Sequence, residues 1–190
     1  MWALVEDSKI SKVYSKPTQL TIGDIKYPSN IHNLWSEAEL KAIGVYTVIE
    51  DNSNLKDKEY YINTDQSFAF ASNKVTATYG TATAKALDDT NESDGTVTRG
   101  LKYTHCMIID NQAYSLLEPN DWMVVRNAES SKAIPSDWLD YRVAVRTAAT
   151  DMKTKINAVS DVDALAALFV YNDATPPVRP LGDWPTEPTS

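Results

Sequence analysis

Residues 119–146 have the sequence PNDWMVVRNAESSKAIPSDWLDYRVAVR, and this stretch organises the second half of the chain. Within it, Pro135, Ser136 and Asp137 mark a helix start. Proline lacks the N–H that the first turn would leave unpaired, and an acid favours the positive end of the helix dipole. The residues that follow recur at spacings of three and four, which predicts one helical stripe. Its members are Trp138, Tyr141, Arg142, Val145, Ala149, Met152 and Ile156.

Arg142 is the one charged residue of this stripe. Its side chain must either extend along its apolar neighbours or pair with an acid such as Asp121 or Asp137. We therefore expect at least one carboxylate, or carbonyl groups, to hold the guanidinium, while its stem packs on Trp138 or Tyr141.

Helical periodicity also precedes and follows this stretch. Apolar residues spaced by three and four over 101–117 predict a helix that ends at Glu118-Pro119. His105 and Cys106 lie next to each other in it, but adjacent helix residues point about 100° apart and do not form a catalytic pair. Ser160-Asp161 is predicted to cap a further short helix.

The first half of the chain has the alternation and turn residues of strands. Ser36 and Glu39 match a capping box, in which each residue bonds the other's backbone N–H at a helix start. In order, we expect a hairpin over 1–14, an extended, irregular segment over 17–28 that turns at Gly23-Asp24, a helix over 37–43, a strand over 45–49 and two or three antiparallel strands over 59–83.

The predicted fold class is α+β. Residues 85–100 are polar and acidic and contain two glycines, which is typical of a flexible connector. Residues 172–190 contain five prolines and are predicted to be an extended tail. The modules expected are an antiparallel β-rich N-terminal module over 1–84, an acidic connector over 85–100, a helical module over 101–171 and a proline-rich tail over 172–190.

Composition excludes several function classes. The 190 residues carry a net charge of −8 and a pI near 4.7 without a basic, aromatic cluster, so we expect no nucleic acid partner. No run of eighteen apolar residues occurs, and the charged N-terminus is unlike a signal peptide, so we expect no membrane insertion and synthesis in the cytoplasm. The single Cys106 has no CxxC partner, and the acids of 88–94 lack the calcium-loop order, so no metal or cofactor is expected.

An enzyme would need a convergent set of reactive side chains. The two histidines, His32 and His105, are far apart in sequence, and no GxSxG, HExxH or phosphate-binding glycine loop is present. No catalysis is expected. A glycan-binding surface is an alternative, formed by aromatic residues that could equally fill the inner face of a sheet: Tyr60, Tyr61, Phe68, Phe70 and Tyr79.

Two sets of motifs resemble phage proteins. The pattern W-x-x-Y-R-x-x-x-R, followed by Trp-Pro-x-x-Pro, resembles the C-terminal region of phage tail fibre assembly proteins over residues 100–190. The motif residues are Trp138, Tyr141, Arg142, Arg146, Trp184, Pro185 and Pro188. The opening MWALVEDSKISKVY, with LKAIGVY at 40–46, is similar to small tail proteins of marine phages, although Asp7-Ser8 stands where those proteins tend to have Asn-Gly.

These resemblances imply a structural component of a phage tail, either a fibre or an adaptor that joins other tail proteins. Such a protein would be made in the host cytoplasm, reside in the virion and form a homo-oligomer there, and the seven motif residues would be its interaction residues. The assembly family alone implies instead a chaperone that leaves the particle. The tail is expected to dock through Trp184, either on its own helical module or on a neighbouring subunit.

Overall fold

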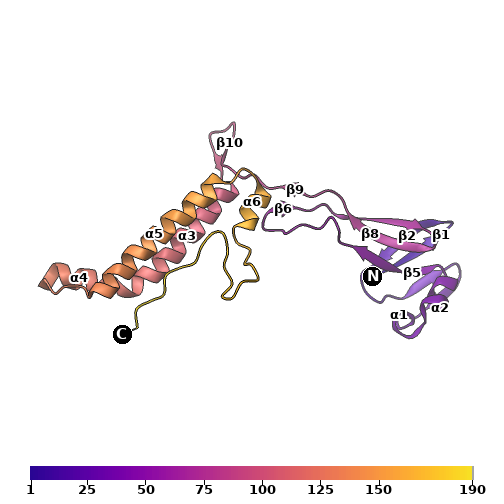
Figure 1. Ribbon diagram of the computed structural model, residues 1–190. Coiled ribbons are helices and arrows are strands. Elements are labelled where there is room, and N and C mark those ends of the chain that lie inside the picture. The colour runs from indigo at the N-terminus through magenta and orange to yellow at the C-terminus, as the bar shows by residue number, and fades with distance from the viewer. Residues whose placement is uncertain (190) are drawn as a thin grey trace. The chain divides into compact units, whose positions relative to one another are not determined.

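A computed structural model describes residues 1–189 and confirms the α+β class (Figure 1). The chain forms two compact units, Met1–Thr83 and the residues from Ala84 onward. The predicted end of the β-rich module at residue 84 lies one residue from this boundary. The predicted connector and tail both belong to the second unit.

The first unit is built on a five-stranded sheet with the order β2-β1-β5-β8-β7. Its strands are β1 Trp2–Glu6, β2 Lys9–Tyr14, β5 Val45–Asp51, β7 Gln66–Ala71 and β8 Lys74–Tyr79. The predicted hairpin at the N-terminus is confirmed. Both residues of its turn, Asp7 and Ser8, have positive φ, as do Ser72 and Asn73 between β7 and β8. Both hairpins therefore use the left-handed two-residue turns that match strand twist.

One pairing in the sheet differs from the antiparallel prediction. β7 and β8 are antiparallel as expected, but β8 lies parallel to β5, with Val48 opposite Val75. Alternation of residue types fixes which side chains share a face, not the direction of the neighbouring strand. The chain between Asp51 and Lys74 is long enough for the crossover that a parallel pair requires.

A β-bulge at Ser11 changes which side chains of β2 share a face of the sheet. Leu4 pairs with Lys12 whereas Val5 pairs with Ile10, so Ser11 is the extra residue. Ile10 and Val13 consequently pack against the same buried cluster, although plain alternation would place them on opposite faces. The buried members of that cluster are Ala3, Val48, Val75 and Ala77.

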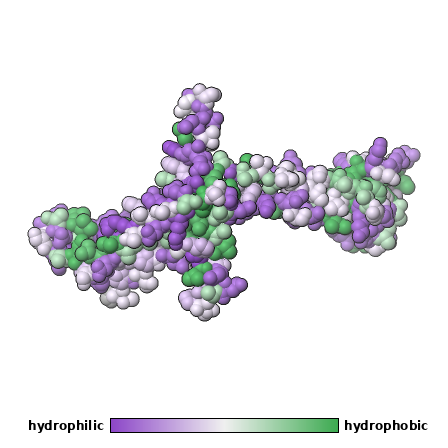
Figure 2. All heavy atoms as spheres, turned by 45° about the horizontal axis from the view of Figure 1, so that its top comes forward, coloured by the Kyte–Doolittle hydropathy of each residue, from purple (hydrophilic) through white to green (hydrophobic). Residues whose placement is uncertain are grey.

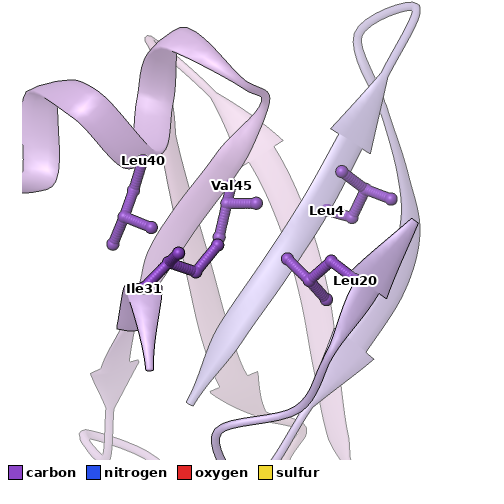
Figure 3. Packing of buried hydrophobic residues seen from close by; sticks show 5 residues of the cluster. All are labelled: Leu4, Leu20, Ile31, Leu40 and Val45. Atoms are coloured by element: carbon purple, nitrogen blue, oxygen red, sulfur yellow. The ribbon is translucent and has the colours of Figure 1, made fainter. Parts of the chain in front are cut away.

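The opposite face of the sheet packs against a small cap. A second buried cluster joins the cap to β1 and β5, and Figure 3 shows its members converging: Leu4, Leu20, Ile31, Leu40 and Val45. The cap contains strands β3 Leu20–Ile22 and β4 Ile25–Tyr27 and helices α1 Ile31–Leu34 and α2 Glu37–Ala42. Residues 17–28, expected to be irregular, thus include a short hairpin, which turns at Gly23-Asp24 as predicted. The capping box of Ser36 and Glu39 is confirmed.

Gly44 connects the cap to the sheet in a backbone conformation that needs glycine. Its φ is +78°, its carbonyl accepts from the Val5 N–H at 2.8 Å, and an added Cβ would lie 2.7 Å from the Val5 carbonyl oxygen. Gly44→Ala should lower the free energy of unfolding of the first unit by about 1–3 kcal/mol. An alanine is strained in the left-handed backbone conformation, and its Cβ would push the backbone of β1 away at Val5. Gly23→Ala, with φ +59° and open space around it, should cost only about 1 kcal/mol. Equal losses in urea titrations would contradict this account.

The stretch 85–100 is folded, in contrast to the flexible connector predicted. It contains a hairpin of β10 Thr90–Asn91 and β11 Val97–Thr98. Two further short strands, β6 Tyr61–Ile62 and β9 Thr83–Ala84, lie before this stretch in the sequence. Its acids act as local acceptors: Asp89 accepts from the Gly100 N–H at 2.9 Å and from Arg99. These bonds, the Gly100 N–H first, lower the pKa of Asp89. An acidic composition was therefore compatible with order.

The second unit is dominated by a pair of helices, α3 Leu101–Leu117 and α5 Ser136–Ala158. They run antiparallel, because contacts join early residues of one to late residues of the other: Cys106 to Asn157, Asp110 to Lys153 and Leu117 to Arg142. The predicted stripe on α5 is buried except for the half-buried Trp138. The remaining elements are the 3-10 turn η1 Glu118–Asn120, α4 Asp121–Ser130 and α6 Val162–Ala167, the last capped by Asp161.

Candidate functional site

Arg142 joins three helical segments at one end of the α3–α5 pair. Its Nη2 donates to the Asp121 carboxylate at 2.6 Å and its Nη1 donates to the Leu117 carbonyl at 3.0 Å. That carbonyl belongs to the last turn of α3, where backbone acceptors lack helical partners. Arg142 is 5% exposed, and its ion pair with Asp121 confirms the predicted pairing with a carboxylate. Arg146 is exposed and donates to the carbonyl of Arg142 at 3.2 Å.

Trp138 and Tyr141 form an edge-to-face pair beside this junction, with ring centroids 5.9 Å apart. Tyr141 is buried. Burial raises the pKa of its hydroxyl, and the Glu187 carboxylate raises that pKa further.

The tail docks on the helices of its own unit, and Leu181 is its buried anchor. Leu181 is 1% exposed, and its N–H donates to the carbonyl of Leu168 at 2.9 Å. Lys155 of α5 donates from Nζ to the carbonyls of Pro180 and Leu181, at 2.9 and 3.0 Å. Docking on the chain's own helical module was one of the two expected outcomes. Trp184, expected to be the anchor, is only half-buried.

Trp184 lies against α3, and Pro185 lies against α5. Trp184 donates from Nε1 to Oε1 of Gln112 on α3 at 3.1 Å. It also lines a pocket of about 490 Å³ with Ile108, Asn111, Gln112, Ser115, Leu116 and Arg179. Pro185 lines a second hollow over α5 with Asp140, Val143, Ala144, Thr147, Ala148, Asp151 and Asp183. We call the surfaces of α3 and α5 that residues 179–188 cover the tail groove; Pro188, near its end, is half-buried.

A second surface of this unit is unusually apolar. Five large apolar residues of α4 and of the first turns of α5 are each 43–54% exposed: Trp122, Val124, Val125, Leu139 and Val143. Within α4, every residue of which is described, only Met123 is buried. Figure 2 shows strongly hydrophobic colouring around α4. We call these five residues the apolar tip.

Of the residues considered for chemistry, His105 and Cys106 lie next to each other in α3. His105 is buried with its ring 4.8 Å from that of Phe169, and burial raises the pKa of the neighbouring Cys106 thiol, which disfavours the reactive thiolate. Between residues 1 and 189, no three His, Cys, Asp or Glu side chains are grouped so that they could hold a metal ion. None of the helices described is long and apolar enough to cross a membrane.

The aromatic residues of the first unit are partly used for packing. Phe68 and Phe70 pack against the cluster around Val75. Tyr60 is 7% exposed, and burial, with the nearby Glu59 and Asp57, raises its pKa to about 12. Tyr61 and Tyr79 are half-buried. At least three of the five aromatic residues considered for glycan binding therefore pack in the interior of the unit.

Comparisons with family models, curated proteins and solved structures found no match to this chain. Support for a function comes from the geometry of the chain and from its motifs.

Proposed function

We propose that this protein is a non-catalytic adaptor that binds neighbouring proteins through the apolar tip of its helical unit. The single observation that carries the proposal is the exposure of Trp122, Val124 and Val125 on a helix that buries one residue. Large exposed apolar surfaces mark binding sites, and buried aromatic side chains supply much of the affinity of an interface.

The length of α4 adds to this argument. Isolated helices shorter than about 12–15 residues are marginal in water, and most helical stability in proteins comes from packing of an apolar face. α4 has 10 residues and packs little against its own unit. Arg126 lies over the Trp122 ring at 4.7 Å, which covers part of one face with a cation. A partner that covers the valines would stabilise the helix.

The setting we propose is a phage tail, in which the chain is a structural component made in the host cytoplasm and present in several copies. This setting is supported by the resemblance of the Trp138–Arg146 and Trp184–Pro188 motifs to tail fibre assembly proteins. Two separate compact units suit an adaptor, since each can bind a different neighbour. A chaperone that uses the same apolar tip transiently is the second candidate.

Val125→Asp should test the apolar tip. A carboxylate in an apolar interface should weaken the binding free energy by at least about 1.4 kcal/mol, which is tenfold in affinity. Incorporation of the chain into particles should therefore fall tenfold or more. Val97→Asp is the matched control, because Val97 is 43% exposed on the hairpin outside the tip. Both variants should keep the thermal midpoint of the original protein. Equal incorporation of the two variants would contradict the proposal.

A further inference from the structure

The tail is fixed in the tail groove at a few separate points. Leu181 fills a buried position, Lys155 holds two consecutive carbonyls, and Trp184 bonds Gln112. The pockets beside Trp184 and Pro185 show that the tail does not fill the surface on either side of it. The tail groove therefore holds a segment that turns over residues 179–182, where the Gly182 N–H donates to the Arg179 carbonyl, and in which a leucine is followed three residues later by a tryptophan.

The segment that leads to the tail is barely packed. Every residue from 170 to 178, which we call the linker, is exposed, including Val170 at 65% and Val178 at 47%. A hollow of about 570 Å³ with mainly apolar walls lies between the linker and the end of α6, lined by Ala167, Val170, Tyr171, Asn172, Val178, Arg179 and Pro180. The linker thus contributes no buried side chain to the unit.

Few bonds close the linker into its present loop. Asn172 supplies three of them: its side chain accepts from the N–H groups of Ala174 and Val178, and its N–H donates to the Val178 carbonyl. The Tyr171 hydroxyl also donates to Asp183 at 2.9 Å, on the surface. Opening the loop would break exposed hydrogen bonds, each worth about 1 kcal/mol, and would uncover no buried apolar side chain of the linker.

We propose that the tail groove also accepts the tail of a second copy of this chain, so that copies join by exchanging residues 179–188. Lys155, Gln112 and the site of Leu181 would meet the same atoms in the exchanged form, and exchange of an identical element is a low-cost route to dimers. Pro176 and Pro177 limit the freedom that the opened linker gains. The exchange uses the tail groove and not α4, so it can fail while the proposed function stands.

Concentration decides between the two forms. A tail on a linker of nine residues meets its own groove at an effective concentration in the millimolar range. Copies at low concentration therefore keep their own tails, whereas copies gathered in an assembly reach local concentrations at which exchange competes. The partner for the groove is a neighbouring copy, and the exchanged tails would link copies in series or in closed pairs.

Two complementary full-length variants test the exchange. Leu181→Asp removes the tail's anchor and leaves the groove intact, and Lys155→Glu with Gln112→Ala removes the donor and acceptor of the groove and leaves the tail intact. Each variant alone should be monomeric by native mass spectrometry. Their mixture should give a heterodimer, at a level at least tenfold above the homodimers of either variant. A mixture that stays as two monomers, with both variants helical by circular dichroism, would overturn the proposal.

If either variant loses its helical signal, an exchange experiment with the unsubstituted chain tests the proposal instead. Light and isotope-labelled copies mixed at about 1 mM, comparable with the effective concentration of the tethered tail, should form mixed dimers, and an excess of a peptide of residues 178–189 should dissociate them. The same peptide with Leu181→Asp should have no effect. Absence of mixed dimers, or dimers that persist in the presence of the first peptide, would overturn the proposal.

Discussion

Leu181→Ala should lower the free energy of unfolding of the helical unit by about 2–5 kcal/mol, the range for truncation of a buried leucine. The side chain is 1% exposed and lies next to the hydrogen bonds that Lys155 and Leu168 make with the tail. Loss of the anchor should therefore release the tail as well as leave a cavity. The change in free energy is measured by urea unfolding, followed by the helical circular dichroism signal.

Leu139→Ala is the matched control for this measurement. Leu139 is 49% exposed on α5, so the same truncation there should cost less than about 1 kcal/mol. Losses for Leu181→Ala and Leu139→Ala that agree within about half a kcal/mol would show that the tail adds nothing to the stability of the helical unit.

Arg142→Ala should lower the same free energy by about 2–4 kcal/mol. Hydrogen bonds of a charged donor contribute about 1.5–3 kcal/mol, and the buried stem adds packing. The Asp121 side chain is 53% exposed and can be rehydrated once unpaired, which keeps the loss below that of a fully buried ion pair. The Leu117 carbonyl, in contrast, loses its donor at a helix junction.

Arg146→Ala provides the comparison for Arg142, since Arg146 is exposed one turn later on the same helix. Its loss should stay below about half a kcal/mol. Arg142→Lys should recover only part of the stability, because a single ammonium cannot match the forked geometry that reaches both acceptors. A loss for Arg142→Ala as small as that for Arg146→Ala would contradict the role of the junction.

Local sequence signals predicted the elements that local physics determines. The spacing of Tyr141, Val145 and Met152 gave the buried face of α5, and Ser36 with Glu39 gave the start of α2, because both depend on residues within a few turns of each other. A carboxylate partner for the guanidinium of Arg142 was predictable, because a buried charge needs a partner of opposite charge.

Contacts between distant segments were beyond such reasoning. The parallel pairing of β5 with β8 depends on where a long crossover returns, which alternation does not encode. The size of tryptophan predicts Trp184 as the anchor of the tail, whereas the structure buries Leu181, the only leucine of residues 172–190. The acids of 85–100 predict flexibility by composition, whereas in the structure Asp89 and Asp94 accept bonds from the backbone N–H groups of Gly100 and Thr96.

Quantitative mass spectrometry of cross-linked, purified particles from the source of this sequence tests the adaptor proposal most directly. Lys132, two residues after the end of α4, offers an exposed amine close in sequence to the apolar tip. The proposal predicts peptides from both units at a fixed ratio to the tail proteins, with cross-links from Lys132 to another chain. A chain that is abundant in the producing cells but absent from the particles would contradict it.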